Sequence, residues 1–174
     1  MRTADTMSDG KEEVLRRQND AKLEEIEAET KKQALTSEKT ALSTLEQHYG
    51  DSPDFLAGIK ELQTKYDTIR IVRGDGNCYY RAFLYSLIEQ MKENEKERKR
   101  ILEHFTKDSW KNAIDIGYDE MALESFYETF VELLEDIDKM KPDEFHRKMN
   151  EENSTSDYCT WYLRVVTATH LKQD

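Results

Sequence analysis

Apolar residues recur at helical spacing through most of this sequence, and that pattern limits the chain to a mainly α-helical fold. The clearest stripe follows Cys78 and consists of Tyr80, Phe83, Leu84, Leu87, Ile88 and Met91. Its i, i+3, i+4, i+7, i+8 spacing predicts a helix with one broad face against a core. Further helices are predicted over 54–67, over 119–140, after Pro142, and from Ser154 to about Leu171. A β-branched stretch, Thr68–Val72, predicts the one short strand.

The segment before Gly50 has a different composition from the rest of the chain. Residues 1–10 are small and polar and are predicted to be disordered. Residues 11–49 lack glycine and proline, so they are predicted to form a charged helical arm. Its apolar residues recur every seventh position but form an incomplete coiled-coil seam, which leaves open a solvated helix or a partner-binding helix. The Gly50–Pro53 break predicts that a domain begins there and covers 50–174.

Charge and composition exclude several classes of function. The net charge of −11 makes the chain a poor candidate for binding nucleic acids. No stretch approaches the ~20 apolar residues of a membrane span, and Met1–Lys11 lacks the apolar region of a secretory signal. Two cysteines are too few for a disulfide framework, so a reducing cytosolic or nuclear compartment is expected. One of them, Cys159, lies on an apolar helix and is expected to be buried and inert.

Metal and cofactor chemistry is not expected from this sequence. The two cysteines and four histidines are scattered along the chain. No C-x-x-C or H-x-x-x-H spacing, which would place ligands for a zinc ion, is present. The expectation is therefore a protein that needs neither a metal nor a cofactor.

Cys78 lies where a turn enters the predicted helix, a position suited to a nucleophile. The N–H groups and dipole at a helix N-terminus favour a negatively charged sulfur. Gly74 and Gly76 can adopt backbone angles closed to other residues, and such a turn can aim successive N–H groups at one anion. The expected oxyanion donors are the backbone N–H groups of Asp75, Gly76, Asn77 and Cys78. The alternative is an ordinary strand-to-helix turn followed by a small buried cysteine.

Several segments carry a family resemblance. The run Asp75-Gly76-Asn77-Cys78-Tyr79-Tyr80-Arg81-Ala82-Phe83 resembles the nucleophile motif of the ovarian-tumour-domain cysteine proteases. The otubain branch is indicated by Lys60–Tyr66, Ile69-Arg70, Phe126-Tyr127-x-x-Phe130, and Ser154–Tyr158 with Tyr162-Leu163-Arg164. These matches keep the order and the approximate separations found in otubains, over about residues 40–171. The resemblance implies the N-terminal helical half of an α+β papain-like otubain domain, with most of the β-sheet missing.

The same resemblance implies a ubiquitin-specific cysteine isopeptidase, that is, a deubiquitinase that removes ubiquitin from lysine side chains or cleaves polyubiquitin. Cys78 would attack the carbonyl of the ubiquitin C-terminal glycine, and Asp75 would belong to the active site and shape the oxyanion hole. Some otubains bind ubiquitin-charged conjugating enzymes without using their cysteine. A non-catalytic module that binds ubiquitin or such conjugates is therefore the alternative, and a helical adaptor unrelated to ubiquitin is a third hypothesis.

No residue of this sequence is identified as the catalytic histidine. In otubains that histidine lies far downstream, after strands that have no counterpart before Asp174. His48 precedes the nucleophile, His104 and His146 lie on predicted helices, and His170 lacks both a strand and a close acidic partner. The chain as given is therefore expected to be inactive or nearly so, as a fragment of a longer protein or as a short relative. Apolar helix faces that would pack on the missing strands are expected to be exposed.

Overall fold

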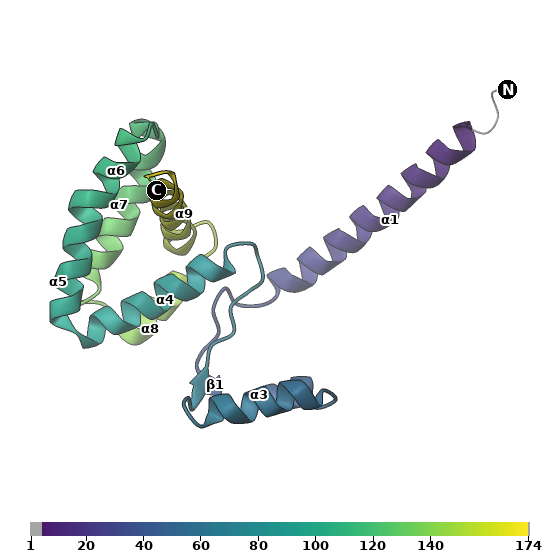
Figure 1. Cartoon of the computed structure of the whole chain (residues 1–174), viewed down its shortest axis with the longest axis horizontal. Coiled ribbons are helices and arrows are strands. Elements are labelled where there is room, and N and C mark those ends of the chain that lie inside the picture. The colour runs from purple at the N-terminus through teal and green to yellow at the C-terminus, as the bar shows by residue number, and fades with distance from the viewer. Residues whose placement is uncertain (1–4, 174) are drawn as a thin grey trace. The chain divides into compact units, whose positions relative to one another are not determined.

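The computed structural model describes residues 5–173, with side chains described from residue 13 onward (Figure 1). Contacts divide the chain into one unit that ends at Ala34 and a second that begins at Leu35. The division falls before the predicted boundary at Gly50, because the segment after Leu35 is part of the second unit. Leu35 and Leu42 are buried, and the Leu35 carbonyl accepts a hydrogen bond of 3.0 Å from the N–H of Arg73.

The first unit contains one long helix, α1 (Asp5–Lys31). Residues 5–10 belong to this helix, so the prediction of disorder is wrong for them, while residues 1–4 lie outside the described part of the chain. The helix ends at Lys31, so the prediction of one continuous helix over 11–49 is also wrong. Its large apolar side chains are more than half exposed: Val14 55%, Leu15 57%, Leu23 57% and Ile26 54%.

An extended stretch after α1 pairs with the segment before the Cys78 turn. β1 (Thr40–Ala41) and β2 (Thr68–Ile69) are antiparallel, with Thr40 opposite Ile69. An isolated bridge joins Thr36 and Val72. The predicted strand over Thr68–Val72 is therefore confirmed in position, although regular pairing covers only its start. Between the two strands the chain forms α2 (Thr44–Tyr49) and α3 (Pro53–Gln63).

The rest of the second unit is built from helices that follow one another with short connections (Figure 1). They are α4 (Cys78–Glu93), α5 (Glu95–Glu103), a π-helix (His104–Ser109), α6 (Trp110–Asp115), α7 (Glu120–Asp136), α8 (Pro142–Met149) and α9 (Thr155–Gln173). The helices predicted from the apolar spacing are confirmed, although the one predicted over 54–67 ends at Gln63 and the one predicted over 119–140 ends at Asp136. With two short strands among residues 5–173, the mainly α-helical prediction is confirmed.

Helices α4, α7 and α9 supply most of the core. Their fully buried apolar side chains include Leu84, Ile88 and Met91 from α4, Phe130, Leu133 and Leu134 from α7, and Cys159 and Tyr162 from α9. The stripe predicted after Cys78 is thus confirmed as a core face. Phe83, predicted to be in this stripe, is nevertheless 46% exposed.

Polar residues fix where several of these helices begin and end. The side chains of Asn94 and Asp119 accept hydrogen bonds from the backbone N–H groups of Glu97 and Ala122, which caps α5 and α7. Pro142 occupies the first turn of α8, where its missing N–H costs nothing. Among the described residues, no helix combines the length and the apolar character needed to cross a bilayer.

The first testable prediction concerns the core of α7. Phe130 is fully buried, and its ring lies 4.8 Å from that of Phe105 and 5.3 Å from that of Tyr162. Replacing it with alanine would leave a cavity, so the free energy of unfolding should fall by about 3–5 kcal/mol. Urea denaturation followed by circular dichroism measures this loss. On the same helix, Met121→Ala is the matched control, because Met121 is 86% exposed and its loss should change stability by about 0.5 kcal/mol or less. Equal effects of the two substitutions would contradict this packing.

Candidate functional site

A buried arginine holds the turn that precedes Cys78. Arg81 lies on the first turns of α4, and its side chain is completely buried. Its Nη2 donates to Asp75 Oδ2 at 2.6 Å and to Asp157 Oδ1 at 3.0 Å, while Nη1 donates to Ser156 Oγ at 2.5 Å. A buried charge is tolerated when it is paired and hydrogen-bonded. Arg81 therefore joins the turn before α4 to the first turn of α9.

Asp75 uses its carboxylate and its backbone to shape the turn itself. Its Oδ1 accepts the N–H of Asn77 at 2.9 Å, and its own N–H donates to the carbonyl of Arg73 at 3.0 Å. Two of the four predicted oxyanion donors, the N–H groups of Asp75 and Asn77, are thus engaged within the turn. Among the described residues, Gly76 and Cys78 are the members of the predicted set whose N–H groups have no intramolecular acceptor. The oxyanion role of the predicted set stays a prediction, and these two N–H groups are the ones that the turn leaves available for it.

Glycine is required at position 76 by the backbone angle. The φ angle of Gly76 is 78°, in the left-handed region that residues with a side chain rarely adopt. Nothing lies within 4 Å of the place where a Cβ would stand. The requirement at this position is therefore conformational and does not come from crowding.

A second arginine, from α9, holds the outer side of the turn. The Nε of Arg164 donates to Asn77 Oδ1 at 3.1 Å, and its Nη2 donates to the carbonyl oxygen of Gly76. The guanidinium carbon lies 5.2 Å from the ring centre of Tyr80 and 5.8 Å from that of Trp161. Helix α9 is therefore joined to the turn in two ways. Ser156 and Asp157 bind Arg81, which in turn binds Asp75, and Arg164 contacts the turn directly.

The two cysteines have opposite environments. Cys78 is the first residue of α4 and is exposed. Cys159 is buried, its Sγ lies 4.0 Å from the carbonyl oxygen of Thr129, and burial raises the pKa of its thiol far above the ordinary value. The prediction that Cys159 is buried is confirmed. The role of Cys78 as the nucleophile stays a prediction, and its exposure at a helix N-terminus is compatible with it.

The contacts of His48, His104 and His146 explain their positions without catalysis. The Nδ1 of His48 lies 3.2 Å from the carbonyl of Thr44, one turn earlier on the same short segment. The Nδ1 of His104 lies 3.3 Å from Asp108 Oδ2 on the π-helix. The third, His146, takes part in a separate pocket.

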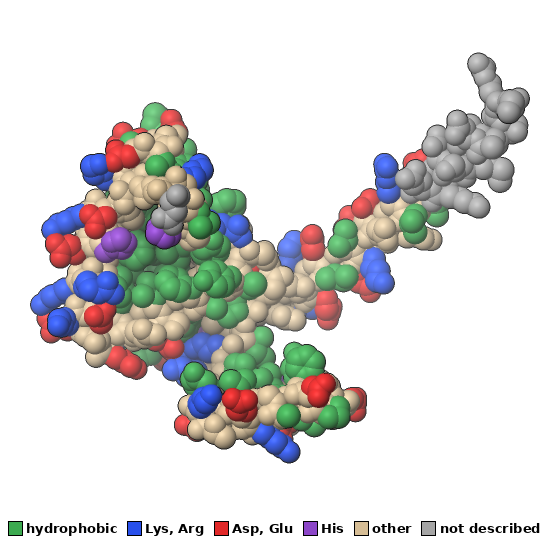
Figure 2. All heavy atoms as spheres, viewed as in Figure 1, with side chains coloured by type: hydrophobic (Ala, Val, Ile, Leu, Met, Phe, Trp, Pro, Cys, Tyr) green, Lys and Arg blue, Asp and Glu red, His purple; other side chains and the backbone are tan. Residues whose placement is uncertain are grey.

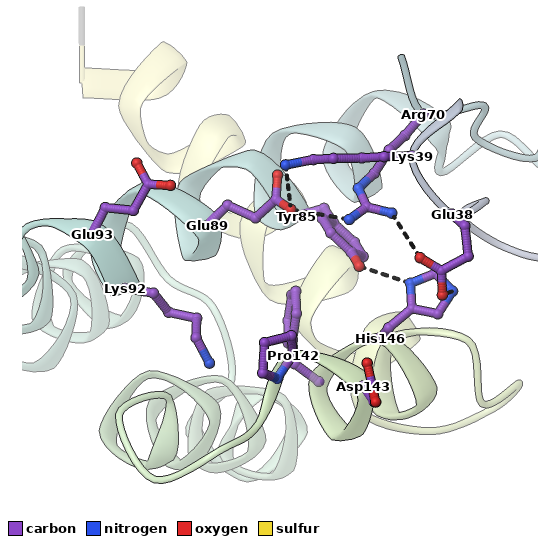
Figure 3. A pocket seen from close by; sticks show the side chains of 11 residues that line it. Glu38, Lys39, Arg70, Tyr85, Glu89, Lys92, Glu93, Pro142, Asp143 and His146 are labelled. Atoms are coloured by element: carbon purple, nitrogen blue, oxygen red, sulfur yellow. Dashed lines mark hydrogen bonds and ion pairs between the residues drawn. The ribbon is translucent and has the colours of Figure 1, made fainter. Parts of the chain in front are cut away.

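That pocket has a volume of about 400 Å³ and is lined by charged and aromatic side chains from the 38–39 segment, α4 and α8 (Figure 3). His146 Nδ1 lies 2.7 Å from the hydroxyl of Tyr85, and Nε2 lies 3.1 Å from Glu38 Oε1. Burial raises the pKa of Tyr85 to about 12, so its hydroxyl stays protonated at neutral pH. Both nitrogens of His146 are thus engaged away from Cys78, which is not among the lining residues. His146 is therefore a structural residue in this conformation.

His170 is the one histidine that follows Cys78 on an element touching the turn. It lies on α9 beyond Arg164, at a rise that corresponds to about 9 Å along the helix axis. At about 100° per residue, the two side chains project from faces roughly 120° apart. Because Arg164 contacts the turn directly and His170 projects from another face of α9, His170 is not expected to deprotonate Cys78. The expectation that the base is not found in this sequence therefore stands, as a prediction.

Three residues of the site were assigned no role from the sequence. Arg81, Asp157 and Arg164 all lie in segments that resemble otubains, but their contacts depend on the tertiary fold. One signal was present for Arg81, because a charged residue stands on the apolar stripe of α4 between Tyr80 and Leu84. Such a residue is rarely buried unless it is paired. The stripe could therefore have predicted a buried ion pair, although not its partners.

Several apolar side chains near the turn are exposed. Tyr79 is 73% exposed and Phe83 46% exposed on α4, and Trp161 is 53% exposed on α9. Figure 2 shows hydrophobic side chains on the visible face of the helical part and further ones over α3. Among the described residues, no group of three or more potential ligands is placed to hold a metal ion.

Comparisons with known proteins identify the family of this chain. The model of the family described as Peptidase C65 Otubain matches residues 28–174. Human ubiquitin thioesterase OTUB1 is 35% identical over 80% of this chain and 52% of its own length. The ovarian tumor domain-containing deubiquitinating enzyme 1 of Arabidopsis thaliana is 34% identical over 84% of this chain and 50% of its own length. The chain thus spans about half the length of these relatives.

A solved structure also resembles this fold. It is described as a complex of ceOTUB1 with ubiquitin aldehyde and UBC13~Ub, and its TM-score to this chain is 0.80 at 30% sequence identity. The similarity covers 87% of this chain and 62% of the matched chain. The arrangement of helices around the turn is therefore shared with a protein solved in complex with ubiquitin.

The second testable prediction concerns Arg81. Methionine at this position would leave the carboxylates of Asp75 and Asp157 without their shared cation, so the free energy of unfolding should fall by about 3–5 kcal/mol. Arg100→Met is the matched control, because Arg100 is exposed and pairs with Glu97 on the same helix, so its loss should cost about 0.5 kcal/mol or less. Urea denaturation of both variants measures the difference. If Arg81→Met were as stable as the control, the pairing around Arg81 would not hold the turn.

Proposed function

The chain belongs to the peptidase C65 otubain family, and from this premise we propose that it carries the nucleophile half of a ubiquitin-specific cysteine isopeptidase. The observation that supports this most is the placement of Cys78. Its side chain is exposed at the start of α4, directly after a left-handed glycine turn that two arginines hold in place. A catalytic cysteine needs this combination of an accessible sulfur and fixed backbone donors.

The proposed reaction begins with attack by the Cys78 thiolate on the carbonyl carbon of the ubiquitin C-terminal glycine. A sulfur–carbon bond forms, and the carbonyl oxygen becomes an oxyanion that the N–H groups of Gly76 and Cys78 stabilise. When this intermediate collapses, the carbon–nitrogen bond breaks and the lysine amine leaves with a proton. Water then hydrolyses the thioester and frees the ubiquitin carboxylate together with the Cys78 thiol.

Asp75 has an indirect part in this proposal. Its carboxylate is engaged by Arg81 and by the N–H of Asn77, so it is not available as a base. We infer that Asp75 shapes the oxyanion site by fixing the turn. A general base must take the thiol proton and return a proton to the amine. Because none of the four histidines is assigned this role here, the chain as given is proposed to be a slow enzyme at most.

A second function, binding without cleavage, is favoured by one specific observation. The related ceOTUB1 was solved together with UBC13~Ub, a conjugating enzyme charged with ubiquitin. We infer that the exposed aromatic residues on α4 and α9 could contact ubiquitin in this chain without any chemistry at Cys78. The acidic net charge of −11 suits partners with basic surfaces. A cytoplasmic or nuclear location is proposed on the same grounds as the reducing compartment expected from the sequence.

The third testable prediction separates these functions by labelling. Ubiquitin that carries a C-terminal vinyl methyl ester should form one covalent adduct with the purified chain, at Cys78, because this thiol is exposed and Cys159 is buried. Gel shift and peptide mass spectrometry measure the adduct and its position. Cys78→Ala should abolish it, and Cys159→Ala should leave it unchanged. An adduct that persists in Cys78→Ala would show that the wrong cysteine was chosen. Binding of ubiquitin without any adduct would favour the non-catalytic module.

The fourth testable prediction concerns turnover. Residues 1–174 should cleave diubiquitin very slowly or not at all, because a triad that lacks one member keeps only a remnant of its rate. The assay compares the unmodified chain with Cys78→Ala and His170→Ala. We expect the remnant rate to be lost in Cys78→Ala and retained in His170→Ala. Robust cleavage that His170→Ala abolishes would instead identify His170 as the base.

A further inference from the structure

The peptide group between Gly76 and Asn77 is held at both ends by hydrogen bonds. Its carbonyl oxygen accepts from Nη2 of Arg164, and its N–H donates to Asp75 Oδ1 at 2.9 Å. In a trans peptide the C=O and N–H groups point in opposite directions. The two bonds lie at opposite edges of the same peptide plane. Together they fix the rotation of the peptide group, which neither bond would do alone.

Each of these bonds leads back to an arginine that is itself held in place. On the N–H side, the second oxygen of Asp75 accepts from the buried Arg81 at 2.6 Å. On the carbonyl side, Arg164 lies over the rings of Tyr80, 5.2 Å away, and Trp161, 5.8 Å away. The peptide is thus clamped between an arginine from α4 and an arginine from α9.

The geometry at Arg164 requires a guanidinium group. Its Nε and Nη2 are neighbouring donors in one plane, and they reach two different acceptors of the turn, Asn77 Oδ1 at 3.1 Å and the Gly76 carbonyl. A lysine ammonium is a point charge on a flexible stem and does not present such a fork. The flat face of the guanidinium also packs against aromatic rings in a way that a lysine does not reproduce.

Without these hydrogen bonds, the Gly76–Asn77 peptide would be the part of the turn most able to rotate. Gly76 has a φ angle of 78°, and glycine adopts positive and negative φ with similar ease. Rotation of this peptide would move the adjoining N–H groups of Gly76 and Cys78 and could turn a carbonyl oxygen toward the sulfur. A carbonyl there would repel an oxyanion, so the orientation of this peptide decides whether the turn can stabilise one.

We propose that Arg164 is a positioning residue of the otubain-type reaction, holding the Gly76–Asn77 peptide so that the N–H groups of Gly76 and Cys78 stay aimed at the oxyanion. This inference rests on the proposed function. It means that a residue of α9 positions the backbone of the turn that precedes α4. Arg164 itself does not contact the reacting atoms in this account. Its effect reaches them through one peptide group.

The fifth testable prediction uses ubiquitin aldehyde as the probe. The thiol of Cys78 adds reversibly to the aldehyde carbon, the thiol proton passes to the former carbonyl oxygen through solvent, and that oxygen occupies the oxyanion site. In Arg164→Met the side chain can still pack on Tyr80 and Trp161 but has no donor. The dissociation constant of ubiquitin aldehyde should rise by about tenfold or more, because small displacements at a reacting centre are costly.

Two further measurements distinguish positioning from simple loss of structure. The affinity for unmodified ubiquitin, compared between Cys78→Ala and Cys78→Ala/Arg164→Met, should change by about twofold or less, because Arg164 is not assigned to the ubiquitin surface. Hydrogen exchange at the Asn77 amide, followed by NMR, should accelerate when Arg164 is lost. Arg100→Met, an exposed arginine of α5, is the matched control and should leave all three measurements unchanged.

The outcomes separate the two proposals. A folded Arg164→Met that keeps the aldehyde affinity and the slow Asn77 exchange of the unmodified chain would overturn the positioning role. If Arg164→Met does not fold, Arg164→Lys takes its place, since it keeps the charge with a single-centre donor and should give a smaller weakening in the same direction. Failure of the unmodified chain to bind ubiquitin aldehyde would overturn the proposed function and with it the role of Arg164 in the reaction, whereas exchange at Asn77 would still show whether Arg164 holds the turn.

Discussion

The arrangement of this site depends on one buried cation. Arg81 is on the core face of α4, next to side chains such as Leu84 that are fully buried, and it is itself without exposed surface. It can remain there because Asp75, Ser156 and Asp157 surround it with acceptors. Removing a partner from such a group leaves an uncompensated charge in the interior. The start of α4 and the start of α9 are therefore fixed relative to each other by electrostatics as well as by packing.

This constraint has consequences for Cys78. The sulfur is at the first position of α4 and is exposed, so packing around it does not determine its surroundings. The turn before Cys78 is instead held by the bond between Asp75 and Arg81 and by the hydrogen bonds that Arg164 donates to Asn77 and Gly76. A rigid turn with an accessible thiol results. The network of Tyr85, His146 and Glu38 lies one helical turn beyond Arg81 on α4 and is separate from the turn before Cys78.

Much of the fold could be read from local sequence patterns. The apolar spacing after Cys78 placed α4 correctly, and Pro142 marked the start of α8, since helix periodicity and proline geometry act over a few residues. The helix predicted over 11–49 ends at Lys31 in the structure. Composition favoured helix there, but the segment beyond Ala34 gains pairing with Val72 and burial of Leu35, which are tertiary contacts that helix propensity does not contain.

The sequence by itself determined the family and the candidate nucleophile Cys78, because both depend on short contiguous motifs, whereas the need for glycine at position 76 came from the φ angle in the structure. Only the tertiary structure decided which backbone N–H groups of the turn already have acceptors, since Asp75 and Asn77 use theirs within the turn. It also decided the partners of Arg81 and Arg164. Arg81 and Asp157 are 76 residues apart in the chain, and a pairing over that separation exists only once α4 and α9 pack together and exclude water from the charge between them.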